Sequence, residues 1–323
     1  MTARPWIRIA ALLAAVTLSG GVAAQDFPNK PIRVVVPYPP GGQSDIFTRL
    51  IADAMQKSLN VPVNVENRAG AGTTLGAGVV AKSPPDGYTL LLAAASATAI
   101  TPMTIKSAAF DPKTITPITL IAKVPYILVA AKEFPPNTVG ELIAYAKANP
   151  GKVNWATHGM GAAQHLTGEM FAKAAGIQIT PIHYQGSTPG VVDMLGGRVE
   201  LMFDGAGTGL ANVRSGKLKA LGMGSDRRVP SEPNLPTWKE SGVPVSAYTW
   251  YGIFAPTGTP MPVLEKLHAA ITEAINGAPY KTRIAQAEGE IPQMSIADTR
   301  KFIADDTAMW QQLIPSLNLK LGE

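Results

Sequence analysis

Three loops in this sequence carry residue types that could bind an anion. Each lies where a predicted strand gives way to a predicted helix, and they span residues 39–45 (PPGGQSD), 158–162 (HGMGA) and 185–188 (QGST). Free backbone N–H groups at a helix N-terminus hold carboxylates and phosphates without a basic side chain. One such loop alone is more often an ordinary turn or cap. Three of them, with Asp204 at a further strand end, favour a ligand cleft.

The same loops do not match the usual motifs of nucleotide binding or hydrolysis. Residues 159–164 resemble G-x-G-x-x-G, but glutamine replaces the third glycine and the next strand does not end in an acidic residue. Neither a P-loop nor a G-x-S-x-G nucleophile elbow occurs in the sequence. Ser44, His165 and Asp204 have the residue types of a hydrolase triad, so an exported hydrolase remains an alternative.

The residue types in this sequence offer little basis for metal binding or thiol chemistry. The chain has no cysteine, which excludes disulfide scaffolds, thiolate zinc sites, cysteine nucleophiles and a lipid-anchored N-terminal cysteine. His158 and His165 are seven residues apart, which on a helix is about 10 Å of rise and too far for one metal. We therefore expect no catalytic residue, no metal and no cofactor, and a binding protein rather than an enzyme.

Alternating strand and helix patterns position these loops. A buried strand is predicted at 32–38, and a helix with one apolar face opens at Ser44. The alternation continues with strands at 63–66, 88–93, 153–157, 179–184, 200–204 and 218–222, and helices at 74–82, 162–175, 188–195 and 211–215. This order is typical of open parallel α/β sheets, whose ligands bind at the carboxyl ends of the strands.

Two extended segments, 118–131 and 248–255, bracket the middle of the chain and could form the two strands of a double hinge. A capping box at Thr138 begins a helix between them. Two terminal helices are predicted at 260–276 and 296–317. The length of 323 residues therefore fits two α/β units better than one.

Residues 1–24 have the three parts of a secretory signal. Arg4 and Arg8 precede an apolar run at 9–18 and a small-x-small cleavage site at 22–24. The run is too short to span a bilayer, which needs about 20 residues. Removing the segment lowers the formal net charge from +5 to +3, and the remaining basic residues are scattered, which argues against nucleic acid. We expect an exported, periplasmic chain without a lipid anchor.

Further motifs follow one another along the chain. They include PYPPGGQSD at 37–45, ENRAGAG at 66–72, PPDGYTLL at 84–91, LGGRV at 195–199 and FAP at 254–256. Each motif alone is modest, but the ordered set covers essentially the whole chain after residue 24. It resembles the Bug family, the extracytoplasmic solute receptors of tripartite tricarboxylate transporters.

The resemblance implies a two-lobed periplasmic binding protein fold, type II-like α/β with a double-strand hinge. Lobe 1 would comprise residues 25–122 plus 252–323, and lobe 2 residues 123–251. It also implies a monomer that captures a small carboxylate, such as a dicarboxylate or an aromatic acid, and delivers it to membrane permease subunits. A ligand-sensing subunit for a membrane signalling partner is the other alternative.

The resemblance further implies the ligand-binding residues. From lobe 1 these are Tyr38, Gly42, Ser44, Asp45 and Ser96, and from lobe 2 Thr157, Gly161, Ala162, His165, Tyr184, Gly186 and Asp204. The chain departs from the family pattern at His158, Met160 and Gln185, where the family usually has small or polar residues and a lysine. These departures disfavour a highly charged tricarboxylate and favour a ligand with an apolar or aromatic body.

Overall fold

The structure is a computed structural model that describes residues 27–104, 110–184 and 187–317. The predicted signal segment 1–24 and the predicted site residue Gly186 lie outside these residues. Within them, no helix has both the length and the apolar character needed to cross a membrane.

The described residues form a nine-stranded mixed sheet with the order β2-β1-β3-β9-β4-β7-β5-β6, in which β8 also pairs with β4. One half contains the parallel strands β1 (Ile32–Val36), β2 (Val63–Asn67) and β3 (Thr89–Ala93). The other half contains the parallel strands β5 (Asn154–Thr157), β6 (Thr180–His183) and β7 (Leu201–Gly205). Each predicted strand is present, with ends that shift by one to three residues.

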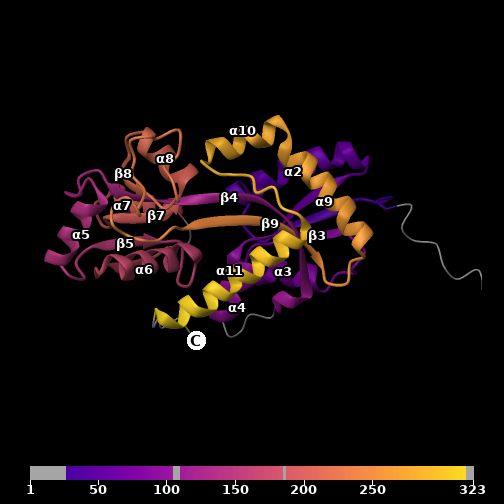
Figure 1. Cartoon of the computed structure of the whole chain (residues 1–323), viewed down its shortest axis with the longest axis horizontal. Helices are drawn as coiled ribbons and strands as arrows, with labels where there is room; N and C mark the ends of the chain where they lie inside the picture. The colour runs from indigo at the N-terminus through magenta and orange to yellow at the C-terminus, as the bar shows by residue number, and fades with distance from the viewer. Residues whose placement is uncertain (1–26, 105–109, 185–186, 318–323) are drawn as a thin grey trace, which may run out of the picture.

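Two long strands, β4 (Ile115–Ala131) and β9 (Tyr248–Pro256), run between the halves (Figure 1). They pair antiparallel, from Ile115 opposite Pro256 to Pro125 opposite Tyr248. Strand β9 also pairs with β3, whereas β4 continues to pair with β7 and with β8 (Leu218–Met223). The two predicted extended segments are therefore neighbours that connect the halves, as a double-strand hinge requires.

Helices cover the sheet and begin where the strand-end loops finish. They are α2 (Gln43–Leu59), α3 (Thr74–Ala81), α5 (Val139–Ala148), α6 (Ala163–Ala175), α7 (Ser187–Leu195), α8 (Ala206–Arg214), α9 (Met261–Asn276), α10 (Ala278–Gln286) and α11 (Ile296–Ser316). The predicted cap of α5 is present, because Thr138 Oγ1 accepts from the Glu141 N–H at 3.1 Å. The Glu141 carboxylate accepts from the N–H of Asn137, at 2.7 Å.

The helices differ from the predictions in three places. Helix α8 begins at Ala206 rather than at residue 211. Its first turns contain glycines, which hide the helical pattern in the sequence but are needed for close packing. A Cβ on Gly209 would lie 2.3 Å from Ile127 Cγ2. The sequence patterns did not predict α10. They also did not predict the π-helical turn Ser96–Ile100, which leads into α4 (Thr101–Thr104).

Helix α11 contacts both halves of the molecule. One buried apolar cluster contains Trp310 and Ile314 of α11, Trp250 of β9 and Leu166 of α6. Near the end of α11, Lys173 Nζ of α6 donates to the Ser316 carbonyl at 3.0 Å. The C-terminal helix is therefore a third connection between the halves, besides the two long strands.

Candidate functional site

A cavity of about 570 Å³ lies between the two halves of the sheet. Residues from both halves, from the two long strands and from α11 form its wall. The first half contributes Tyr38, Pro39, Ser44, Gly72, Thr73, Ala94, Ala95, Ser96, Thr101 and Thr104, and the second half contributes residues 158–164. The long strands contribute Tyr126, Tyr248, Thr249 and Tyr251, and α11 contributes Trp310. The volume is within the range of small-molecule sites. A second cavity of about 560 Å³ beside α11 is lined by none of the predicted site residues.

The structure brings five of the predicted site residues to the wall of this cavity: Tyr38, Ser44, Ser96, Gly161 and Ala162. Six others do not line it, namely Gly42, Asp45, Thr157, His165, Tyr184 and Asp204. Most of these six are held in hydrogen bonds within the loops around the cavity.

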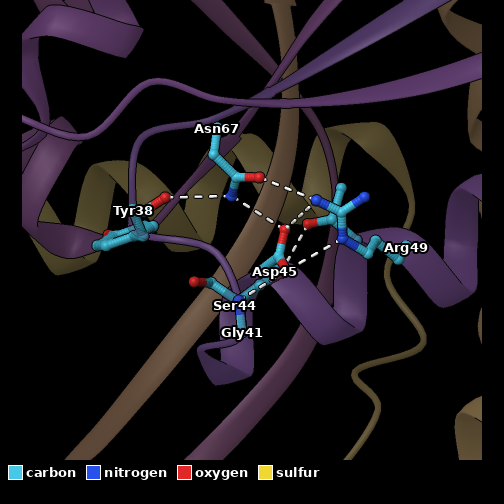
Figure 2. A network of polar contacts seen from close by, with 7 residues as sticks. Tyr38, Gly41, Ser44, Asp45, Arg49 and Asn67 are labelled. Carbon is cyan, nitrogen blue, oxygen red and sulfur yellow. Dashed lines mark hydrogen bonds and ion pairs between the residues drawn. The ribbon is translucent and has the colours of Figure 1, made fainter.

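Asp45 organises the loop that opens α2 (Figure 2). Its carboxylate is 3 % exposed and accepts from Gly41 N at 2.9 Å, Arg49 Nε at 3.0 Å and Asn67 Nδ2 at 2.9 Å. Burial alone would raise the pKa of Asp45, but hydrogen bonds from Arg49, Gly41 and Asn67 outweigh it and lower that pKa. Asn67 also donates to the Tyr38 carbonyl at 3.1 Å, which ties the end of β1 to the same network.

The first turn of α2 reaches the cavity at Ser44, which lines its wall. Gly42 is the N-cap and no side chain caps the helix, so the first N–H groups have no partner within it. Beside them, the hydroxyls of Tyr38 and Ser96 are hydrogen-bonded at 2.8 Å. Burial raises the pKa of Tyr38 to about 12, so its hydroxyl stays neutral and can donate. This wall suits a carboxylate.

The second wall is the start of α6, which also has no side-chain cap at Ala162. Gly161 N donates to His165 Nδ1 at 3.0 Å, and the His165 ring stacks on Trp155 at 5.8 Å between centroids. Thr157 Oγ1 lies 2.8 Å from His183 Nδ1 and accepts from Gly159 N. Thr157 and His165 thus fix the shape of the glycine loop from behind.

Tyr184 and Asp204 also lie behind this wall. The Tyr184 hydroxyl donates to Asp193 Oδ2 at 2.7 Å. Asp204 accepts from Gly205 N at 2.8 Å and from Ser187 Oγ at 2.9 Å, and its Oδ1 is 3.5 Å from His158 Nε2. Burial lowers the pKa of His158, although the charge of Asp204 opposes this shift.

These contacts do not form the arrangement of a serine hydrolase. Such an enzyme needs a histidine hydrogen-bonded to the nucleophilic serine. Here Ser187 donates to Asp204 rather than to His158. In the predicted triad, the ring nitrogens of His165 face Gly161 and Glu169, at 3.0 and 3.6 Å. Within the described residues, neither Ser187 nor Ser44 has a histidine hydrogen-bonded to its hydroxyl.

Four buried polar atoms of residues on the cavity wall have no hydrogen-bond partner within the described chain: Thr73 Oγ1, Tyr126 OH, His158 Nε2 and Trp310 Nε1. Buried polar groups are normally paired, so these atoms are suited to a bound molecule. Sequence reasoning did not identify Thr73, Tyr126 or Trp310 as site residues. Tyr126 is 1 % exposed and lies in an apolar strand, where the sequence pattern indicates a residue of the hydrophobic core.

The cavity wall has no lysine, arginine, aspartate or glutamate among the described residues. Anion binding there would depend on the two helix starts and on hydroxyl groups, as the strand-end loops indicated.

A family model described as "Tripartite tricarboxylate transporter family receptor" matches residues 47–319. Protein BugT of Bordetella pertussis is 36 % identical over 317 residues, which cover 97 % of each chain. The structure of the periplasmic binding protein BugD is 35 % identical, covers 90 % of this chain and 98 % of BugD, and has a TM-score of 0.79. That of R. palustris Rpa4515 with adipate is 28 % identical, covers 90 % and 98 %, and has a TM-score of 0.83. The similarity to BugD confirms the predicted fold class.

Proposed function

The chain belongs to the tripartite tricarboxylate transporter receptor family, as its motifs predicted, and from this premise we propose that it captures a small carboxylate between its lobes and delivers it to membrane permease subunits. Its relative Rpa4515 is described with adipate, which is a carboxylate. The main support within this chain is the uncapped start of α2, which lies at the cavity beside the Tyr38 and Ser96 hydroxyls. Delivery would take place in the periplasm, after removal of residues 1–24.

The proposed contacts of the carboxylate are the Tyr38, Ser44 and Ser96 hydroxyls and the backbone N–H groups that follow Gly42. Gly161 and Ala162 would close over the ligand from the other side. Asp45, Thr157, His165, Tyr184 and Asp204 would hold these two loops in place through the hydrogen bonds described above. In this proposal a helix start contributes about 0.3–2 kcal/mol and each charge-assisted hydrogen bond about 1.5–3 kcal/mol. Three or four such bonds are enough for micromolar affinity.

We further propose that the lobes are residues 25–122 plus 252–323 and residues 123–251. Both boundaries then fall at one position of the long strand pair, because Ala122 lies opposite Tyr251. The register between β4 and β9 shifts just before this position, between Leu120 and Ala122. A change of backbone angles there would move the lobes apart. Ligand contacts made only in the closed form would shift the population towards closure.

A thermal-shift screen of mono-, di- and tricarboxylates and aromatic acids tests ligand capture. An acid at 100 times its Kd raises the free energy of unfolding by about 2.7 kcal/mol, a readily measured shift. Tyr38→Phe should weaken the best binder, whereas Tyr145→Phe, remote from the cavity, should not. Loss of uptake of that acid in a strain lacking this chain would support delivery to a permease. The proposal fails if no acid stabilises the protein, or if the acid is recovered chemically altered.

A further inference from the structure

We propose that Asp306, an acid on the C-terminal helix α11, is a positioning residue for ligand binding, because its buried carboxylate oxygen holds the Trp310 indole against the wall of the cavity. This inference rests on the proposed function and adds to it a residue that does not line the cavity itself. It follows from the place of Trp310 in the fold and from the groups that surround Asp306.

Trp310 is the one residue of α11 on the cavity wall among the described residues. It is 6 % exposed and belongs to the buried cluster with Ile314, Trp250 and Leu166, which joins the two halves of the molecule. A flat indole at this place offers the body of a ligand a surface to pack against. The orientation of the ring therefore bears on affinity.

Trp310 differs from the other unpartnered residues of the wall, because an acceptor of the chain lies beside its indole. Asp306 precedes it by four residues, so the two side chains lie one turn apart on the same face of α11. Trp310 Nε1, Trp250 Nε1 and Asp306 Oδ2 are all buried, and none has a hydrogen-bond partner within the described chain. Both indole N–H groups are nevertheless near enough to Asp306 to lower its pKa. One acceptor and two donors thus stand together, and a small rotation of a ring would pair them.

The charge of Asp306 is unfavourable for the fold. Burial raises the pKa of Asp306 to about 6, although the two indole N–H groups act against this shift. A carboxyl with a raised pKa lowers the free energy of unfolding at neutral pH, because it ionises more readily in the unfolded chain. Such a group, one turn from a residue of the cavity wall, is more typical of a functional position than of packing.

The titratable groups around α11 have partners of their own or stay neutral. The π-helical turn that packs against the helix carries no titratable side chain. Raised pKa values keep Tyr126, Tyr248 and Tyr251 of the long strands neutral. The charged groups of α11, β4 and α6 are engaged elsewhere: Lys301 pairs with Asp305, Lys123 with Glu290, His165 lies 3.6 Å from Glu169, Lys173 donates to the Ser316 carbonyl, and Arg300 lines the second cavity. The Asp306 carboxylate therefore acts chiefly on the two indoles.

The main test is Asp306→Asn, which keeps the shape of the side chain but removes its charge. Calorimetric Kd values for adipate, malate and benzoate, or for the best acid of the thermal-shift screen if none of these binds, are measured on the mature chain at about pH 7.5. We expect affinity for the tightest acid to fall at least threefold, while stability in urea stays the same or rises. Charge repulsion alone predicts the opposite, tighter binding of an anion. Asp305→Asn makes the same change in charge at an exposed position and should alter neither value.

A double substitution shows whether Asp306 acts through Trp310. Trp310→Phe keeps an aromatic ring on the wall but has no N–H group, so in this background Asp306→Asn should change Kd by less than about 1.5-fold. Trp250→Phe removes the other indole, which does not line the cavity. In that background Asp306→Asn should still weaken binding threefold.

The pH dependence gives a third measurement, which also serves if Asp306→Asn does not fold. Protonation removes the charge of Asp306, so lowering the pH from about 7.5 to about 5 should shrink the affinity advantage of the wild type over Asp306→Asn and over Trp310→Phe. Wild-type stability relative to these variants should rise over the same range, because the unfavourable charge is lost as the pH falls from about 6 towards the unfolded value of about 4. Affinity and stability should thus change in opposite directions.

The inference is overturned if Asp306→Asn binds the acid as tightly as the wild type or more tightly. It is also overturned if the effect of Asp306→Asn persists in Trp310→Phe, or if relative affinity and relative stability change in the same direction with pH. If no acid of the screen stabilises the wild type, the proposed function itself fails, and this inference fails with it.

Discussion

The two helix starts that line the cavity are built in opposite ways. At α2, Asp45 holds Gly41, Arg49 and Asn67 in a charged network that the ligand would not touch. At α6, the loop is held by Thr157 and His165, which accept from Gly159 N and Gly161 N, and His158 Nε2 has no hydrogen-bond partner within the described chain. The first arrangement fixes backbone donors in advance, which lowers the cost of ordering them on binding. The second leaves polar groups for the ligand to satisfy. In the proposed site, rigidity would therefore come mainly from the α2 wall and adaptation to the ligand from the α6 wall.

The largest expected effect comes from breaking the charged network. Asp45→Ala leaves Gly41 N, the Asn67 amide and Arg49 without their acceptor and should lower the free energy of unfolding by about 3 kcal/mol. Carboxylate affinity should fall at least tenfold while the protein stays folded. Urea unfolding and calorimetry measure the two effects. Asp305→Ala, which breaks only an exposed pair with Lys301, should cost less than about 0.5 kcal/mol. Unchanged carboxylate affinity in Asp45→Ala would mean that the network does not shape the site.

Acid should weaken the same network. The pKa of Asp45 is lowered in the folded protein, so its carboxylate stabilises the fold fully above the unfolded value of about 4. This stability is lost as the pH falls through the lower folded pKa. Asp45→Asn should therefore be less stable than the wild type at neutral pH, and the difference should shrink below about pH 4. Parallel unfolding free energies down to about pH 2 would contradict the lowered pKa.

A smaller effect is expected at the floor of the cavity. Tyr126→Phe removes a buried hydroxyl that has no partner, so stability should stay the same or rise by up to about 1 kcal/mol. Ligand affinity should fall by about three- to tenfold if the ligand satisfies this hydroxyl. Calorimetry and thermal unfolding of the same preparation separate the two effects. Lower stability with unchanged affinity would show that the hydroxyl serves the fold.

The smallest effect on binding is expected behind the second wall. Tyr184→Phe removes the hydrogen bond to Asp193 but no group of the cavity wall, so affinity should change less than twofold. We also expect the free energy of unfolding of Tyr184→Phe to fall by about 1 kcal/mol. A tenfold loss of affinity would instead place Tyr184 in contact with the ligand, as the sequence resemblance implied.

Local patterns predicted the strands and most helices, because periodicity and caps such as Thr138 act over a few residues. They could not assign Asp45 to a network, since Asn67 lies 22 residues away and only the sheet brings it close. Tyr126 was missed for the opposite reason: its strand is apolar on both faces, and nothing local distinguishes a core tyrosine from one at a cavity. Residue types thus predicted several residues that line the cavity, whereas the contacts of each residue depended on partners distant in the sequence.

Strand β4 has a consequence for cooperativity. Its first part pairs with β9 beside the first half of the sheet, and its last part pairs with β7 and β8 in the second half. β4 is therefore the outer strand of the first half and a central strand of the second, so neither half can lose it without disturbing the other. We therefore expect the halves to unfold in one transition, and a fragment cut within residues 115–131 to leave both pieces with an unpaired, aggregation-prone edge.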